Sequence, residues 1–122
     1  MAKHLEIGKV GEALAQQLLM GKGYKILAAN WRWSRAEVDL IAQDHNTLVF
    51  VEVKTRSRSD FGQPEEFITP RKERFLADAA SVYMEQTGHE GPIRFDVVAV
   101  LYRSPQDYTI EHYEDAFFPG LE

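Results

Sequence analysis

Apolar side chains recur every three or four residues in two stretches of the chain, a period typical of amphipathic helices. The stripe of the first stretch consists of Ile7, Val10, Leu14 and Leu18. Gly21 and Gly23 follow it and predict the end of this helix. A second helix is predicted over residues 70–85, since Thr69 suits the N-cap and Pro70 the first helical position. Its stripe consists of Phe75, Leu76, Ala79, Val82 and Tyr83.

Other stretches are rich in Val, Ile, Leu and aromatic residues without the helical period, which predicts strands. These are residues 24–30, 36–43, 48–55, 94–101 and 108–113. Turn-forming residues at 44–47 join the second and third strands into a β-hairpin. The fourth strand is almost continuously apolar, so we expect it inside the sheet and the fifth at an edge. Residues 57–69 lack a clear period and predict a mobile loop.

The predicted order is helix, three strands, helix, two strands, which is typical of an α/β fold: a mixed central sheet of about five strands flanked by helices. The chain has 122 residues, of which 44% are hydrophobic. That length suits one core without disulfides or structural metal, so residues 1–122 are expected to form a single domain.

Composition narrows the class of protein. The chain has no cysteine, which excludes disulfide frameworks, thiolate zinc sites and a cysteine nucleophile. No apolar segment follows the N-terminal basic residues, and no stretch is long enough to span a bilayer. We therefore expect a cytoplasmic protein without a membrane partner.

The formal net charge of −5 at first argues against a nucleic-acid partner. However, residues 107–122 hold five acids and no Lys or Arg, and without these five the chain has 14 acids and 14 bases. We therefore interpret residues 107–122 as an acidic C-terminal tail on a neutral body. The bases of the body cluster around residues 32–35, 54–58 and 71–74, as either a local phosphate-binding rim or ordinary solvated surface.

Three ionisable residues in the predicted hairpin are candidates for chemistry. Glu52 and Lys54 lie on one face of an apolar strand, and Asp39 lies within the equally apolar preceding strand. Burying charges is costly unless they are paired or bind metal. Carboxylates bind Mg²⁺ or Mn²⁺, which can activate water, and a lysine can orient that water or offset charge on a phosphoryl transition state. The non-catalytic alternative is a structural Glu52–Lys54 ion pair.

One pattern consists of Asp39, a gap of twelve residues, and then Glu52-Val53-Lys54. It resembles the PD-(D/E)XK signature of restriction-endonuclease-like nucleases. Val38 stands where the signature has its proline. Blocks along nearly the whole chain resemble the YraN-like family of small bacterial proteins, although Ala36 replaces a glycine usual in that family. The blocks are Gly11-Glu12-Ala13, residues 23–27, 37–42, 50–56 and 94–98.

This resemblance implies a restriction-endonuclease-like core similar to Holliday-junction resolvases, and a Mg²⁺- or Mn²⁺-dependent endonuclease acting on DNA, with branched or structured DNA as one substrate class. It implies a homodimer, because two cuts need two sites. Asp39, Glu52, the Val53 carbonyl and Glu12 would be metal ligands, and Lys54 would be the catalytic lysine. Helical periodicity alone instead places Glu12 about 140° from the apolar stripe, and therefore in solvent.

Further candidates are less specific. Arg32, Arg56, Arg58 and Lys72 are possible nucleic-acid contacts or simply exposed charge. Trp31 and Trp33 flank Arg32 and would either stack on unpaired bases or pack in the core. Asp96 is expected to be a buried partner for a base such as Arg94. The four histidines have no zinc-like spacing and are interpreted as surface residues: His4, His45, His89 and His112.

Two rival functions remain open from the sequence. One is a protein that keeps the nuclease fold but binds nucleic acid or another protein without cutting, and the neutral body and acidic tail favour it. The other is an accessory subunit that is active only within a larger DNA-processing assembly.

Overall fold

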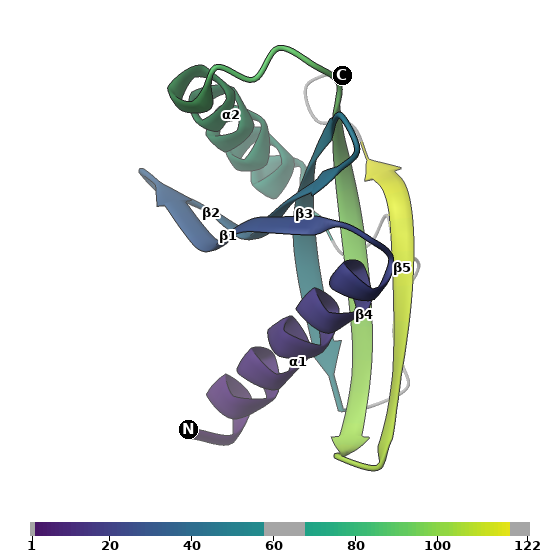
Figure 1. Ribbon diagram of the computed structural model, residues 1–122. Coiled ribbons are helices and arrows are strands. Elements are labelled where there is room, and N and C mark those ends of the chain that lie inside the picture. Colours follow the sequence, from purple (N-terminus) through teal and green to yellow (C-terminus); the bar gives the residue numbers. More distant parts are fainter. Residues whose placement is uncertain (1, 58–67, 118–122) are drawn as a thin grey trace.

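The computed structural model describes residues 2–57 and 68–117, with side chains from Ile7 onward. Five strands form one mixed sheet in the order β1-β2-β3-β4-β5, in which only β3 and β4 are parallel. Figure 1 shows the arrangement. The elements are α1 (Ala2–Gly21), β1 (Lys25–Trp33), β2 (Ala36–Asp44), β3 (Thr47–Arg56), α2 (Pro70–Thr87), β4 (Ile93–Ser104) and β5 (Asp107–Phe117).

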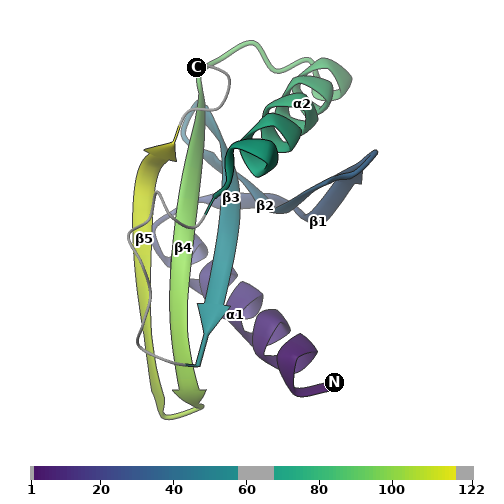
Figure 2. The ribbon, with the colours of Figure 1, turned by 180° about the vertical axis from the view of Figure 1, so that it is seen from behind.

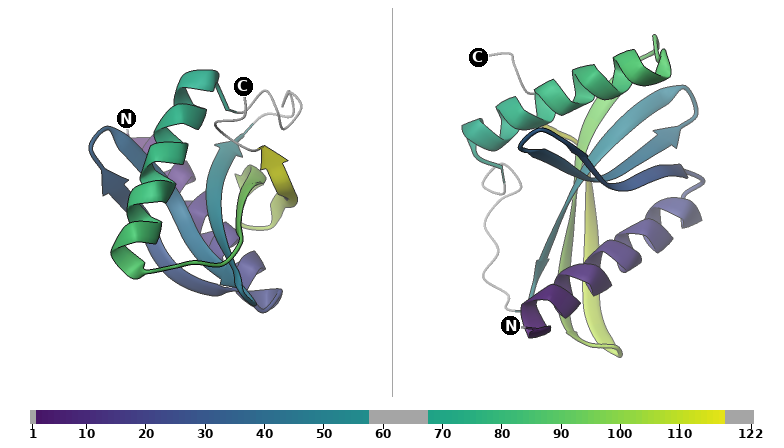
Figure 3. Two further views of the ribbon diagram at one scale, coloured as in Figure 1. Left: turned by 90° about the horizontal axis from the view of Figure 1, so that it is seen from above. Right: turned by 90° about the vertical axis from the view of Figure 1, so that its left-hand side faces the viewer.

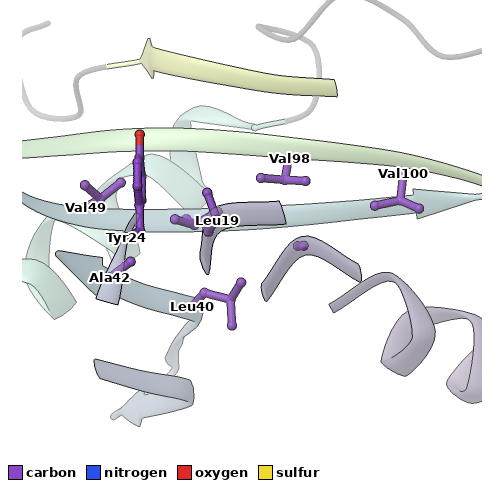
Figure 4. Packing of buried hydrophobic residues seen from close by; sticks show 9 residues of the cluster. Leu19, Tyr24, Leu40, Ala42, Val49, Val98 and Val100 are labelled. Carbon is purple, nitrogen blue, oxygen red and sulfur yellow. The ribbon is translucent and has the colours of Figure 1, made fainter. Parts of the chain in front are cut away.

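The two helices cover opposite faces of the sheet (Figures 1 and 2). Alternating residues of β3 show this directly: Val49 and Val51 pack toward α1, whereas Leu48 and Phe50 pack toward α2. The α1-side core is drawn in Figure 4, where Leu19 lies among Leu40, Val49 and Val98. The expected α/β class, with a five-stranded mixed sheet and flanking helices, is therefore confirmed.

The buried face of α1 differs from the predicted stripe. Gly11, Ala15 and Leu19 are buried, whereas Leu14 and Leu18 are only half-buried. Small residues allow the helix to approach β3 so closely that a Cβ built on Gly11 would lie 1.9 Å from Thr55 Oγ1. Glu12 consequently lies about 60° from the buried face. It is half-buried, so it lies less far into solvent than periodicity predicted.

The strand that follows α1 is longer than predicted and forms a hairpin that the sequence did not indicate. β1 runs on through Trp33 and pairs with β2 across a tight turn at Ser34, whose φ is 57°. The β2–β3 hairpin was predicted, but Asp44 and Thr47 pair with each other, so its turn is only His45 and Asn46. Figure 3 shows the β1–β2 hairpin between the two helices.

The second helix begins where predicted and runs two residues beyond the predicted end, to Thr87. The Lys72 backbone N–H donates to Thr69 Oγ1 over 3.1 Å, and Pro70 occupies the first turn. Gly88 ends the helix in a left-handed conformation with φ 72°. Most of the predicted mobile loop, residues 58–67, lies outside the described residues.

The C-terminal residues differ from the predicted acidic tail. β4 pairs with strands on both sides, and β5 is the edge strand, as predicted. However, β5 spans Asp107–Phe117, so most of the predicted tail belongs to the sheet. The Phe117 ring lies 5.4 Å from that of Phe95, within its own core. Among the described residues, neither helix is long and apolar enough to cross a membrane.

Candidate functional site

Asp39 lies where β2 separates from β3. The β2–β3 ladder ends at the pair Leu40 and Val51, so Asp39 and Glu52 are one step beyond it. Val38 packs toward α2 and Leu40 toward α1, which interrupts the usual alternation of faces at Asp39. The side chain takes over the role of the missing ladder partner, because Asp39 Oδ2 accepts the Val53 backbone N–H over 2.8 Å.

Glu52 is a buried carboxylate on the α2 side of β3, with an exposed fraction of 4%. Its Oε2 lies 3.4 Å from Lys54 Nζ on the same strand and 3.6 Å from Lys72 Nζ on α2. Its Oε1 is buried without a hydrogen-bond partner. One oxygen therefore serves two ammonium groups while the other is left unsatisfied, although buried polar atoms are normally bonded.

The electrostatic surroundings of Asp39 oppose its ionisation. Burial, together with the negative charges of Glu52 and Glu12, raises the pKa of Asp39 to about 7, although the Val53 N–H and Lys72 act in the opposite direction. Burial and a neighbouring carboxylate both favour the protonated acid. Asp39 is therefore only partly ionised at neutral pH.

The third predicted acid takes another partner. Glu12 Oε1 accepts a hydrogen bond from Asn30 Nδ2 over 3.1 Å, and Asn30 has a left-handed backbone with φ 53° opposite Asp39. No group of three His, Cys, Asp or Glu side chains is placed to hold a metal ion within residues 2–57 and 68–117. Glu12 as a third ligand therefore stays a prediction, as does the Val53 carbonyl.

The donor set nevertheless fits a hard cation. Asp39 and Glu52 offer only carboxylate oxygens, and the unbonded Glu52 Oε1 is an acceptor with no donor. Mg²⁺ commonly uses one or two carboxylates and keeps several waters. An ion here would satisfy Oε1 and would offset both causes of the raised pKa of Asp39, burial first and the neighbouring Glu52 charge second.

The predicted nucleic-acid contacts are dispersed. Arg32 lies 3.5 Å from Glu37 and is largely exposed, and Arg56 donates to its neighbour, the Thr55 carbonyl. Arg58 lies outside the described residues. Lys72 alone of the described candidates contacts the acidic pair.

The two tryptophans behave differently from each other. Trp31 packs edge-on against Tyr83 with ring centres 5.3 Å apart, as the core interpretation predicted. Trp33 is exposed at the hairpin end and is still available for stacking.

A second charged cluster, on the α1 side, was only partly predicted. Asp96 is fully buried and is bonded by Arg94 and His112, with distances of 2.9 Å from Arg94 Nε and 2.7 Å from His112 Nε2. Its predicted role as a partner for Arg94 is confirmed. The expectation that His112 lies on the surface was wrong, since 2% of its side chain is exposed. The signal was present: Ile110 and His112 alternate along β5 onto one face, opposite Val100 and Val98.

The other histidines follow expectation to differing degrees. His45 is almost fully exposed, and His89 is half-buried against the Pro92 carbonyl. The side chain of His4 lies outside the described residues.

Comparisons with known proteins agree on one family. Residues 11–100 match the family described as "Uncharacterised protein family UPF0102". A UPF0102 protein of Flavobacterium psychrophilum is 48% identical over 118 residues, covering 97% of this chain and 98% of the relative. One of Thermodesulfovibrio yellowstonii is 44% identical over 114 residues, covering 93% and 97%. One of Phocaeicola vulgatus is 40% identical over 121 residues, covering 99% of each. Matched along most of its length by both comparisons, the chain belongs to the UPF0102 family, which confirms the YraN-like resemblance of its sequence.

Proposed function

We propose that this protein is a Mg²⁺- or Mn²⁺-dependent endonuclease that hydrolyses phosphodiester bonds in DNA, including branched or structured DNA, in the cytoplasm. The observation that carries the proposal is the Glu52 carboxylate: it is buried with one oxygen unbonded, next to Asp39 and two lysines. We also propose that the sheet is a restriction-endonuclease-like core that works as a homodimer, as the sequence pattern implies.

Each residue of the site has a definable task. Asp39 and Glu52 would hold the ion, which when bound neutralises phosphate charge and lowers the pKa of a coordinated water. Lys54 Nζ, on the face of Glu52, would orient the attacking water and offset negative charge that develops on the phosphate oxygens. The Val53 N–H fixes the direction of the Asp39 carboxylate before substrate arrives.

A purely structural ion pair explains the arrangement less well. A stabilising buried pair satisfies both oxygens of its acid, because an unpaired buried acceptor costs about 1–3 kcal/mol. Here Glu52 Oε1 has no partner, while Lys54 and Lys72 share Oε2. An incompletely satisfied acid beside a second acid is the pattern expected of a ligand-binding site.

The test is cleavage of labelled duplex, single-stranded, flapped and four-way-junction DNA with Mg²⁺ or Mn²⁺. We expect metal-dependent products that disappear with chelator. Asp39→Asn and Lys54→Met should each lower the rate at least about 100-fold, because each removes a group that acts in the transition state.

Matched controls separate chemistry from folding. Asp78→Asn, an exposed acid on α2, and Lys25→Met, an exposed lysine on β1, should keep wild-type rates. Lys54→Met should still bind Mn²⁺ in calorimetry, whereas Asp39→Asn should bind it more weakly. DNA binding without any cleavage would instead support the non-catalytic binding protein.

A further inference from the structure

Lys72 connects α2 to the acidic site. It lies in the first turn of α2, where its backbone N–H is used by the Thr69 cap. Its Nζ lies 3.6 Å from Glu52 Oε2, although its side chain remains 36% exposed. The backbone of Lys72 is thus fixed by the cap, while its ammonium group contacts both the acid and solvent.

Both lysines contact the same oxygen of Glu52, and the contact of Lys72 is the one that local geometry does not explain. Lys54 is two residues from Glu52 on the same strand, so its proximity follows from β geometry. Lys72 comes from a different element and shares an oxygen that already has a cation, while Oε1 has none. Its contact with Glu52 is therefore a weak one, as expected for a partly exposed ion pair.

We propose that Lys72 exchanges partners during binding: it rests on Glu52 in the free protein, is released when a divalent cation takes the Glu52 carboxylate, and then binds a phosphate of the nucleic-acid backbone. This rests on the proposed function of Glu52 as a metal ligand. The exchange couples the two binding events, since a cation and a lysine compete for one acid and the displaced lysine improves the phosphate site.

The position of Lys72 suits a phosphate. The first turn of a helix carries a partial positive charge and favours anions, and a displaced ammonium there adds to it. Arg71, the preceding residue, lies over the Phe75 ring at 5.5 Å and points along the helix surface. Lys72 is therefore the cation of this turn that faces the acidic pair.

The primary test is Mn²⁺ binding by calorimetry to the full-length protein without nucleic acid. Lys72→Met removes a competing cation, so Mn²⁺ affinity should rise about tenfold, the effect of one like charge near a divalent ion under strong solvent screening. Arg71→Met and Lys25→Met remove the same charge elsewhere and should change the affinity less than about twofold. Urea denaturation verifies folding, and Lys72→Gln provides a second variant with a polar side chain.

A second readout is binding of a short DNA duplex, made in a Lys54→Met background to prevent turnover. With Mn²⁺ present, adding Lys72→Met should weaken binding about tenfold and reduce the salt dependence by about one phosphate contact. With chelator present, the same change should have a smaller effect.

The outcomes distinguish this inference from the proposed function. Unchanged or weaker Mn²⁺ binding in Lys72→Met, with wild-type binding intact, would overturn the partner exchange alone. Absence of Mn²⁺ binding in the wild-type protein would overturn the metal site and, with it, the exchange. Tighter Mn²⁺ binding with weaker DNA binding is the result that supports it.

Discussion

Asp96 and Glu52 are buried acids on neighbouring interior strands, yet their surroundings are opposite. Asp96 faces α1 and receives bonds from Arg94, His112 and the Asp115 backbone N–H. Although burial raises its pKa, the bonds from His112 and Arg94 outweigh this and lower it below the usual value. Glu52 faces α2 with one unbonded oxygen, and it helps raise the pKa of Asp39.

The difference shows that the hydrogen bonding of a buried acid indicates its role. An acid whose acceptors are all satisfied belongs to the framework, because its bonds offset the cost of desolvation. An acid left unsatisfied is held in place by the rest of the fold. Its unfavourable desolvation free energy is offset only when a ligand binds. The Asp96 cluster joins β4 to β5, and the Asp39–Glu52 site is the one to which we assign chemistry.

The largest expected effect comes from breaking the satisfied cluster. Asp96→Asn leaves Arg94 and His112 without their shared anion, and loss of one partner of a buried pair typically costs about 3–5 kcal/mol. We expect that decrease in the free energy of unfolding, measured by urea denaturation at pH 7. The matched change Asp78→Asn, on the exposed face of α2, should cost less than about 0.5 kcal/mol. A loss below about 1 kcal/mol would show that the cluster does not stabilise the fold.

This contribution also has a pH signature. Because the folded-state pKa of Asp96 is lowered, its stabilisation is complete above the unfolded value of about 4 and is lost as pH falls through the lower folded value. The difference in stability between wild type and Asp96→Asn should therefore shrink below pH 4.

A smaller effect of opposite sign is expected at the unsatisfied site. The folded-state pKa of Asp39 is raised, so the protein loses stability as pH rises from about 4 to about 7. Asp39→Asn keeps an acceptor for the Val53 N–H without the charge. At pH 8 without metal, it should raise the free energy of unfolding by about 2 kcal/mol, half of the roughly 4 kcal/mol that about three pKa units represent, because Asp39 is only half-buried and solvent screens its charge.

Two further measurements test the origin of that gain. At pH 4 the Asp39→Asn and wild-type proteins should be almost equally stable, because Asp39 is then protonated. Adding Mn²⁺ at pH 8 should stabilise wild type more than the variant, which binds the ion more weakly. An Asn variant less stable than wild type at pH 8 would mean that Asp39 is a framework residue like Asp96.

The smallest effect should come from the exposed rim of the Asp96 cluster. Lys22 Nζ lies 2.9 Å from His112 Nδ1. An ammonium only donates, so Nδ1 accepts and the Nε2–H donates to Asp96. Lys22→Met should cost no more than about 0.5 kcal/mol in urea denaturation, as for most surface substitutions. A loss comparable to that of Asp96→Asn would place the stabilising charge at the surface instead of in the buried part.

The helices and most strands could be predicted because their periods are local. The buried face of α1 could not, since hydrophobicity does not mark Gly11 or Ala15 as contact residues, and the closeness of Gly11 to Thr55 depends on the sheet. The β1–β2 hairpin was missed because its turn at Ser34 lacks the usual glycine or asparagine.

In the candidate site, too, local patterns could be predicted and long-range contacts could not. Asp39, Glu52 and Lys54 followed from a short pattern in two adjoining strands. The Lys72–Glu52 contact joins α2 to β3, and the burial of His112 depends on β5 pairing beside β4. Such long-range partners are set by packing and leave no local period in the sequence.

The acidic edge strand has a consequence for assembly. Among the described strands, β5 pairs with β4 alone, and Asp107, Glu111, Glu114 and Asp115 are exposed along it. A second copy placed edge to edge would bring these like charges together, a device by which natural sheets resist aggregation. The acids that first argued against DNA therefore disfavour edge-to-edge pairing of β5, and the proposed homodimer is expected to use a different surface.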